Sequence, residues 1–229
     1  MINKKKILAI VPARGGSKGI KLKNLKKIKG KTLVEITSKF IDDCKFIDAK
    51  VLSTDHPAIL KIGESLNFKN ITRPKKLSGN KISDYQVITH ALKNFVKGNF
   101  FPDYIIYLQP TSPVREKKHL FDTIKKTIKN KYDASWSVNK VSIKYHPLKL
   151  LKINKKRLQL IDKKGERIIA RQMLEPTYVR NGVFYIFNTK KLLIKKTIYL
   201  KKILASITKY QVANIDDLDD LNHARKLMY

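Results

Sequence analysis

The stretch that decides the fold is residues 7–19, which read ILAIVPARGGSKG. Its first half is an unbroken apolar run that closes on Pro12, and such a run is typical of a strand buried on both faces of a parallel sheet. Its second half places three glycines beside Arg14 and Lys18. In an open parallel sheet, ligands bind beyond the carboxyl ends of the strands. Because glycine lets backbone N–H groups approach an anion closely, the loop favours phosphate; alone, it could equally be a tight turn with solvated basic residues.

Strand and helix patterns alternate after this loop. Thr32 with Glu35, and Ser83 with Gln86, have the spacing of capping boxes, and Asp55 is predicted to cap a short helix that begins near Pro57. Predicted strands lie at residues 50–54, 68–72, 104–108 and 133–138, and predicted helices at 33–41, 83–95 and 117–129. This alternation predicts a doubly wound α/β fold with a mostly parallel, Rossmann-like sheet.

The pattern changes between residues 140 and 170. Short alternating pieces at 148–153 and 158–161 suit a β-hairpin better than a strand–helix unit. Strands predicted at 183–187 and 210–213 and a closing helix at 217–227 then return the chain to the sheet. We expect one domain over residues 1–229, with 140–170 as a small β-rich excursion. Because strands so short need a partner for their apolar faces, the excursion predicts a homodimer contact.

Composition excludes several classes of protein. The chain has 229 residues, 42% of them hydrophobic, which is typical of a globular fold. A single cysteine, Cys44, excludes an internal disulfide and a site of several thiolates. The apolar start at residues 7–13 is too short for a signal peptide, and no other stretch reaches the length of a membrane span. We therefore expect a soluble, cytoplasmic protein without a membrane partner.

The formal net charge of +32 first suggests nucleic acid as a partner. The basic residues are, however, 42 lysines and 8 arginines spread along the whole chain. No RNP-like, zinc-finger or basic-zipper pattern accompanies the charge, so we expect no specific nucleic-acid partner. In so lysine-rich a chain, the few arginines are the better candidates for recognising phosphate or carboxylate groups.

Several motifs occur together in a characteristic order. Residues 10–19 are followed by Lys23-Asn24, by Arg73-Pro74 and by residues 108–115, which read LQPTSPVR. Residues 171–172, 181–185 and 214–216 complete the series. This combination resembles the acylneuraminate cytidylyltransferases, also called CMP-sialic acid synthetases, over nearly the whole chain. The resemblance implies that the anomeric hydroxyl of a nonulosonic, sialic-acid-like sugar attacks the α-phosphorus of CTP, giving CMP-sugar and pyrophosphate with Mg²⁺.

The resemblance also implies a set of site residues. Catalytic roles fall on Arg14, Lys23 and Asp216. Nucleotide-binding positions are Arg14, Gly15, Gly16, Ser17, Lys18, Lys23, Asn24, Arg73 and Ser83. Sugar-binding positions are Gln109, Arg171 and Tyr185, and the magnesium position is Asp216 with Asn214. From the residues alone, Tyr185 suits the core better than a site, and Asp216 could simply favour the N-terminus of the closing helix.

Three positions depart from the family pattern. Lys21 stands where the family usually has proline, Asn80 where an aspartate is common, and Asn214 where the first aspartate of an Asp-x-Asp pair is usual. Two alternatives therefore stay open. One is a nucleotidyltransferase of the same fold that uses another nucleotide or a keto-deoxy-octulosonate. The other is a nucleotide- or sugar-binding protein without turnover, which the altered aspartate pair would favour.

Overall fold

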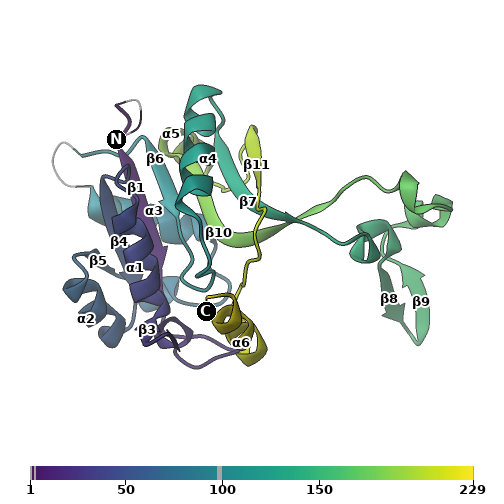
Figure 1. The fold of residues 1–229 in the computed structure, drawn as a ribbon, viewed down its shortest axis with the longest axis horizontal. Helices are drawn as coiled ribbons and strands as arrows, with labels where there is room; N and C mark the ends of the chain where they lie inside the picture. Colours follow the sequence, from purple (N-terminus) through teal and green to yellow (C-terminus); the bar gives the residue numbers. More distant parts are fainter. Residues whose placement is uncertain (1, 3, 97–99, 229) are drawn as a thin grey trace. The chain divides into compact units, whose positions relative to one another are not determined.

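The structure is a computed structural model that describes all residues except 1, 3, 97–99 and 229. It divides into two compact units (Figure 1): unit 1 comprises residues 1–137 and 181–229, and unit 2 comprises residues 138–180. Unit 2 therefore interrupts unit 1 in the sequence. The excursion predicted at residues 140–170 falls inside it.

Unit 1 is built on a seven-stranded sheet. Its strands are β1 (Ile7–Pro12), β4 (Ala49–Thr54), β5 (Lys69–Thr72), β6 (Tyr104–Tyr107), β7 (Ala134–Lys140), β10 (Tyr178–Asn188) and β11 (Ile203–Ile207), in the order β11-β7-β10-β6-β1-β4-β5. The α-helices are α1 (Leu33–Asp43), α2 (Pro57–Ser65), α3 (Asp84–Phe95), α4 (Lys117–Lys129), α5 (Thr189–Lys195) and α6 (Leu218–Leu227). A small ribbon, β2 (Lys27–Ile28) and β3 (Lys31–Thr32), and two 3-10 turns, η1 (Lys23–Leu25) and η2 (Lys75–Leu77), complete the unit.

Helices cover both faces of the sheet. In β1, Ile7, Ala9 and Val11 pack into one apolar cluster with side chains of α1, α2 and α4. Leu8 and Ile10 point to the other face, into a cluster with side chains of α3 and α5. Figure 1 shows α1 and α4 in front of the sheet. Burial on both faces explains why β1 is an unbroken apolar run instead of an alternating one.

Strand pairing confirms the predicted fold class. β1 pairs in parallel with β4 and with β6, and β4 pairs in parallel with β5. β10 runs antiparallel to β6, with Tyr185 opposite Tyr107, so the sheet is mixed but mostly parallel. Its parallel part brings the carboxyl ends of β1, β4 and β6 to one edge. A third apolar cluster, which includes Ile20, Leu33 and Leu221, packs α6 against α1 and the loop after β1.

Both predicted capping boxes are confirmed. Thr32 Oγ1 accepts a hydrogen bond from the Glu35 backbone N–H at 3.2 Å, and Glu35 Oε2 accepts one from the Thr32 backbone N–H at 2.6 Å. Ser83 and Gln86 make the same reciprocal pair at the start of α3. These bonds satisfy N–H groups that the first turn of a helix leaves without partners.

Two local predictions are wrong. Asp55 does not cap α2, which begins after His56, because its Oδ1 instead accepts a hydrogen bond from the Gly15 backbone N–H at 2.8 Å. Residues 210–213 form no strand. β11 occupies the sheet edge beside β7, so the apolar side chains of Val212 and Ala213 pack against the core from an irregular segment.

Unit 2 contains the predicted hairpin and short 3-10 turns. Its elements are η3 (Ile143–Tyr145), η4 (Pro147–Lys149), β8 (Leu151–Asn154), β9 (Arg157–Leu160), η5 (Lys163–Arg167) and η6 (Arg171–Met173). β8 and β9 pair antiparallel, with Ile153 opposite Leu158, and Lys155 and Lys156 between them both adopt positive φ. Two successive left-handed residues are the mark of a tight two-residue hairpin turn.

Candidate active site

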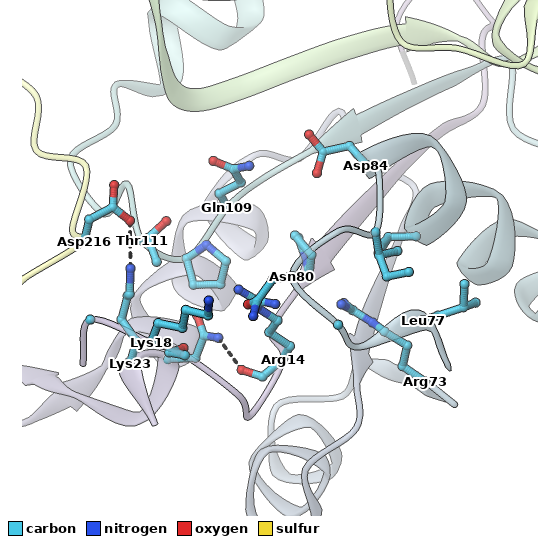
Figure 2. A pocket seen from close by; sticks show the side chains of 18 of the residues that line it. Arg14, Lys18, Lys23, Arg73, Leu77, Asn80, Asp84, Gln109, Thr111 and Asp216 are labelled. Atoms are coloured by element: carbon cyan, nitrogen blue, oxygen red, sulfur yellow. Dashed lines mark hydrogen bonds and ion pairs between the residues drawn. The ribbon is translucent and has the colours of Figure 1, made fainter. Parts of the chain in front are cut away.

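A pocket of about 610 Å³ opens in unit 1 at the carboxyl ends of β1 and β6 (Figure 2). The segments that line it are the loop after β1, η1, the stretch from Arg73 to α3, the end of β6 and the segment before α6. The predicted site residues that line it are Arg14, Ser17, Lys18, Lys23, Asn24, Arg73, Gln109, Asn214 and Asp216. Segments far apart in the sequence therefore meet at the edge where a parallel sheet binds its ligands.

The loop after β1 is held from three sides. Gly15 donates its backbone N–H to Asp55, at the end of β4, as described above. Asn24 Nδ2 donates to the Arg14 carbonyl oxygen at 2.9 Å, and the Asn24 Oδ1 atom is buried without a partner among the described residues. At Gly19, a Cβ atom would overlap the carbonyl oxygen of Asp216, so only glycine permits this approach. The loop is thus pinned against the segment that carries Asp216.

Four cations line the pocket, against two carboxylates. Arg73 is only 5% exposed, and it donates to the Ser53 hydroxyl at 3.2 Å and to the Ser53 carbonyl oxygen at 2.8 Å. Burial lowers the pKa of Arg73. Arg14 donates to the Ser78 carbonyl oxygen at 3.4 Å, and Lys18 completes the cationic lining together with Lys23. This excess of positive charge suits an anionic ligand such as a phosphate chain.

Lys23 and Asp216 form an ion pair inside the pocket. Lys23 Nζ lies 2.8 Å from Asp216 Oδ1 and donates to the Ile215 carbonyl oxygen at 2.7 Å. Figure 2 shows the two side chains pointing toward one another. The helix cap of α6 is supplied instead by Asp217 and Asp220, which bond to each other's backbone N–H groups. The Asp216 carboxylate is therefore not needed as the cap of α6, and 75% of its side chain is exposed.

The segment after β6 is fixed by Arg115. Its Nε donates to the Val183 carbonyl oxygen of β10 at 2.9 Å, and its Nη2 donates to the Gln109 carbonyl oxygen. Removal of its guanidinium from water lowers the pKa of Arg115 to about 9. Arg115 thus connects the backbone of Gln109, which lines the pocket, to the neighbouring strand.

The donors beside the pocket fit a magnesium ion that is shared with a phosphate ligand. Asp216 offers a carboxylate, and Asn214 offers an amide oxygen that already accepts a hydrogen bond from the Ser112 hydroxyl at 3.2 Å. Neither the pocket nor any other described part of the chain holds a group of three or more His, Cys, Asp or Glu side chains that could bind a metal without a ligand's help. Proteins usually bind Mg²⁺ through one or two carboxylates together with substrate phosphates and water, which is what this pair can supply.

Several predicted residues do not line the pocket. Gly15 and Gly16 belong to its loop but are not among the residues that line it, and Gly16 is exposed. Ser83 caps α3 with its side chain, and Tyr185 is buried in the core, where its ring meets Trp136 edge-on at 6.1 Å. Arg171 belongs to η6 of unit 2, where it is exposed.

Several lining residues escaped the sequence reasoning, and two of them form a polar pair. Tyr107, at the end of β6, and Asp84, the first residue of α3, both line the pocket and are joined by a hydrogen bond. A signal for Tyr107 existed, because it lies two residues before Gln109, and strand alternation places residues two apart on one face. Asp84 carried no signal beyond its place after the Ser83 cap.

Comparison with known proteins agrees with the motifs. The N-acylneuraminate cytidylyltransferase of Escherichia coli O18:K1:H7 is 31% identical over 227 residues, which are 96% of this chain and 51% of that protein. The pseudaminic acid cytidylyltransferase of Campylobacter jejuni serotype O:2 is 27% identical over 227 residues, 98% of this chain and 96% of that protein. The chain spans about half the length of the E. coli protein and of its Streptococcus agalactiae counterpart.

Solved structures and a family match complete the comparison. A structure of CMP:2-keto-3-deoxy-manno-octonic acid synthetase complexed with CTP has a TM-score of 0.71 at 13% identity, and the likeness covers 97% of this chain and 98% of that one. In the part of the chain that the structure describes, no helix is long and apolar enough to span a membrane. Residues 8–224 match the cytidylyltransferase family. The resemblance drawn from the motifs is confirmed, and the chain belongs to the cytidylyltransferase family.

Proposed function

We propose that this chain transfers CMP from CTP to the anomeric hydroxyl of a nonulosonic, sialic-acid-like sugar and releases pyrophosphate. The observation that carries the proposal is the pocket at the carboxyl ends of β1 and β6, which four cations line, two of them from the family's glycine-rich loop. The relatives named N-acylneuraminate and pseudaminic acid cytidylyltransferase support this choice of nucleotide and of sugar class.

The pocket suits nucleotidyl transfer because that reaction depends on positioning and charge neutralisation more than on covalent help. The sugar oxygen forms a bond to the α-phosphorus and gives up its hydroxyl proton to solvent, the bond from that phosphorus to the bridging oxygen breaks, and pyrophosphate departs with the electron pair. Arg14, Lys18 and Lys23 line the pocket, where they would bind the phosphate oxygens and stabilise the negative charge on the departing pyrophosphate. Arg73 and Asn24 would hold the nucleotide from the buried side of the pocket.

Magnesium is part of the proposal. Asp216 and Asn214 are the residues that would hold it, and when bound it neutralises phosphate charge. In the free protein, the charge of Asp216 is balanced by Lys23. A bound triphosphate gives Lys23 a second anion, and this frees the Asp216 carboxylate for other partners.

We also propose a homodimer formed through unit 2. On one face of the hairpin, Leu151 and Ile153 of β8 stand opposite Leu160 and Leu158 of β9. The side chains of Ile153 and Leu158 are 76% and 67% exposed. The other face carries polar residues, including Lys152 and Gln159. A two-sided hairpin of this kind needs an apolar partner, and a second copy of the chain presents the same surface.

Three further expectations stay proposals. Arg171 is proposed to pair with the sugar carboxylate, since a guanidinium can bind a carboxylate through two parallel hydrogen bonds. Tyr185 is proposed only to shape the sheet beneath the sugar, because its side chain is buried. A cytoplasmic location is proposed because CTP is a cytoplasmic metabolite and the single cysteine, Cys44, is buried and free.

The decisive experiment measures pyrophosphate release with CTP, UTP, ATP and GTP against a panel of nonulosonic acids and a keto-deoxy-octulosonate. We expect release with CTP and at least one nonulosonic acid, and much slower release with the other nucleotides. Equal rates with UTP or ATP would refute the choice of nucleotide. Release only with the octulosonate would show that the sugar substrate is a keto-deoxy-octulosonate. Binding of CTP without pyrophosphate release would favour a binding protein.

A further inference from the structure

Asp84 and Tyr107 form a polar pair in the pocket. Neither residue has a role in the proposed reaction so far. Tyr107 ends β6, and Asp84 begins α3. The Tyr107 hydroxyl donates a hydrogen bond to Asp84 Oδ1 at 3.0 Å, and both residues line the pocket. The pair is therefore positioned where part of a bound substrate would lie.

The pair is arranged so that the side chain of Asp84 presents a hydrogen-bond acceptor. Asp84 lies in the first turn of α3, where the helix dipole favours a negative charge. Tyr107 is buried, and burial raises the pKa of its hydroxyl well above the usual value, so the hydroxyl stays protonated and donates. Its hydrogen bond occupies Oδ1. The other oxygen, Oδ2, makes no hydrogen bond within the described part of the chain and remains available to a ligand.

The two carboxylates of the pocket differ in their surroundings. Asp216 is paired with Lys23 at 2.8 Å, whereas Asp84 forms no ion pair with any described residue. Figure 2 shows Asp84 and Asp216 on opposite sides of the view, with Lys18 and Lys23 on the side of Asp216. A phosphate chain is attracted to the lysines and repelled by Asp84. The part of the ligand that meets Asp84 should therefore carry no negative charge and should donate a hydrogen bond.

We propose that Asp84, oriented by Tyr107, accepts a hydrogen bond from a neutral donor of the bound substrate, either a hydroxyl or an N–H group, and thereby helps to select that substrate. The inference rests on the proposed function for the identity of the substrates. Such donors occur both on the nucleoside of CTP and on the sugar, and the experiment separates the two sources.

The test compares Asp84→Asn with the wild-type protein. The amide oxygen of asparagine can still accept the Tyr107 hydrogen bond, so the fold should survive while the charge is lost. Calorimetry gives the Kd of CTP, and steady-state pyrophosphate release gives the KM of the sugar. Because the variant weakens a hydrogen bond to a charged acceptor, we expect either the Kd of CTP or the KM of the sugar to rise by on the order of 10- to 100-fold. Asp122→Asn, which removes an exposed carboxylate from α4, is the matched control and should match the wild type.

Each result decides a specific point. A weaker Kd for CTP places the donor on the nucleoside, and a higher sugar KM with unchanged CTP binding places it on the sugar. If both constants stay within about twofold of the wild-type values, or if CTP binds more tightly to Asp84→Asn, the inference is overturned. Absence of turnover in the wild-type protein would instead refute the proposed function, and the calorimetric comparison would still test Asp84.

Tyr107→Phe tests the positioning role separately. The variant removes only the hydroxyl that orients the carboxylate, so it should shift the same constant as Asp84→Asn, in the same direction and by less. In the double variant Asp84→Asn, Tyr107→Phe, the second change should add little, because the group that it positions has lost its charge. Fully additive losses, or a shift in the other constant, would show that Tyr107 does not act through Asp84.

Discussion

Unit 1 and unit 2 differ in how far they bury their apolar side chains. In unit 1, every residue from Ile7 to Val11 is fully buried between two layers of helices. In unit 2, Ile169 is 90% exposed, and Ile153 and Leu158 are exposed by more than half. Burial of apolar surface is the main source of folding stability, at about 25 cal/mol per Å². Unit 1 therefore has a core of its own, whereas unit 2 leaves apolar surface exposed that the proposed dimer would cover.

The same contrast holds for polar groups. Unit 1 buries polar side chains in pairs, such as Ser137 with Asn181 at 2.6 Å and Thr127 with Ser135 at 2.6 Å. Such pairs fix side chains in single orientations, which a binding pocket needs. The hydrogen bonds of unit 2 lie mostly in short turns and in its hairpin. We therefore propose that unit 1 carries the chemistry and that unit 2 carries the assembly, and the predictions below test this proposal.

The largest effect is expected at the proposed metal position of unit 1. Asp216→Asn should nearly abolish turnover, because it removes the carboxylate that would share Mg²⁺ with the phosphates. Asn214→Asp should lower the Mg²⁺ concentration needed for half activity, because it adds a charge beside Asp216. Titration of Mg²⁺ against pyrophosphate release measures both. If Asp216→Asn changes the melting temperature but not the Mg²⁺ dependence of turnover, the metal site lies elsewhere.

The next effect is expected from the pocket cations. Arg14→Ala and Lys23→Ala should each lower kcat/KM by on the order of 100-fold or more, since each removes a charged donor aimed at developing charge. The melting temperature should change little, because neither side chain belongs to the apolar core. Lys118→Ala, at an exposed lysine of α4, is the control and should keep full activity. If turnover and the melting temperature were both unchanged in both variants, the proposal that the loop binds phosphate would be refuted.

A smaller effect is expected in unit 2. Replacing both Ile153 and Leu158 with aspartate should weaken the proposed dimer by roughly 10-fold or more, because it puts charge on the apolar face of the hairpin. Light scattering at micromolar concentration measures the oligomeric state. Lys152→Asp on the opposite face is the control and should leave assembly unchanged. A wild-type protein that is already monomeric under these conditions would contradict the assignment of unit 2.

The smallest effect is expected from His119 on α4 of unit 1. Its Nε2 lies 2.7 Å from the Ser206 hydroxyl and its Nδ1 lies 3.3 Å from the Tyr210 hydroxyl, and partial burial lowers its pKa. When the pH falls below about 6.5, the usual pKa of histidine, the imidazole of His119 takes up a proton more readily in the unfolded chain than in the folded chain. The free energy of unfolding should therefore fall as the pH drops from 7 toward 5. His119→Gln should have a flatter urea-derived stability profile over that range.

The sequence could predict features that depend on neighbouring residues. The buried run of β1 and the capping boxes at Thr32 and Ser83 are local signals, and all three are confirmed. Residues 210–213 have strand-like composition, but the place beside β7 goes to β11, and the choice between two candidate strands depends on distant pairing. Short-range pattern therefore located most elements, and long-range competition decided that β11, and not residues 210–213, forms the edge strand.

The same limit applies to the site. Lys18 and Gln109 could be predicted because each lies within a recognisable motif, and both line the pocket. Asp84 and Tyr107 meet only because α3 packs beside the end of β6, and Arg115 reaches Val183 across 68 positions of sequence. Contacts of this kind leave no pattern in a single sequence, so the pairings of Asp84 with Tyr107 and of Arg115 with Val183 escaped prediction.

The position of β10 also has a consequence for how the chain is made. This strand lies between β6 and β7 in the middle of the sheet, yet it follows unit 2 in the sequence. A ribosome adds about 5–20 residues per second, so β6 emerges several seconds before the strand that covers its free edge. During that interval the nascent chain exposes an unpaired apolar strand, which is the kind of edge that promotes aggregation. Yield of this protein should therefore depend on translation speed and on chaperones that bind nascent chains.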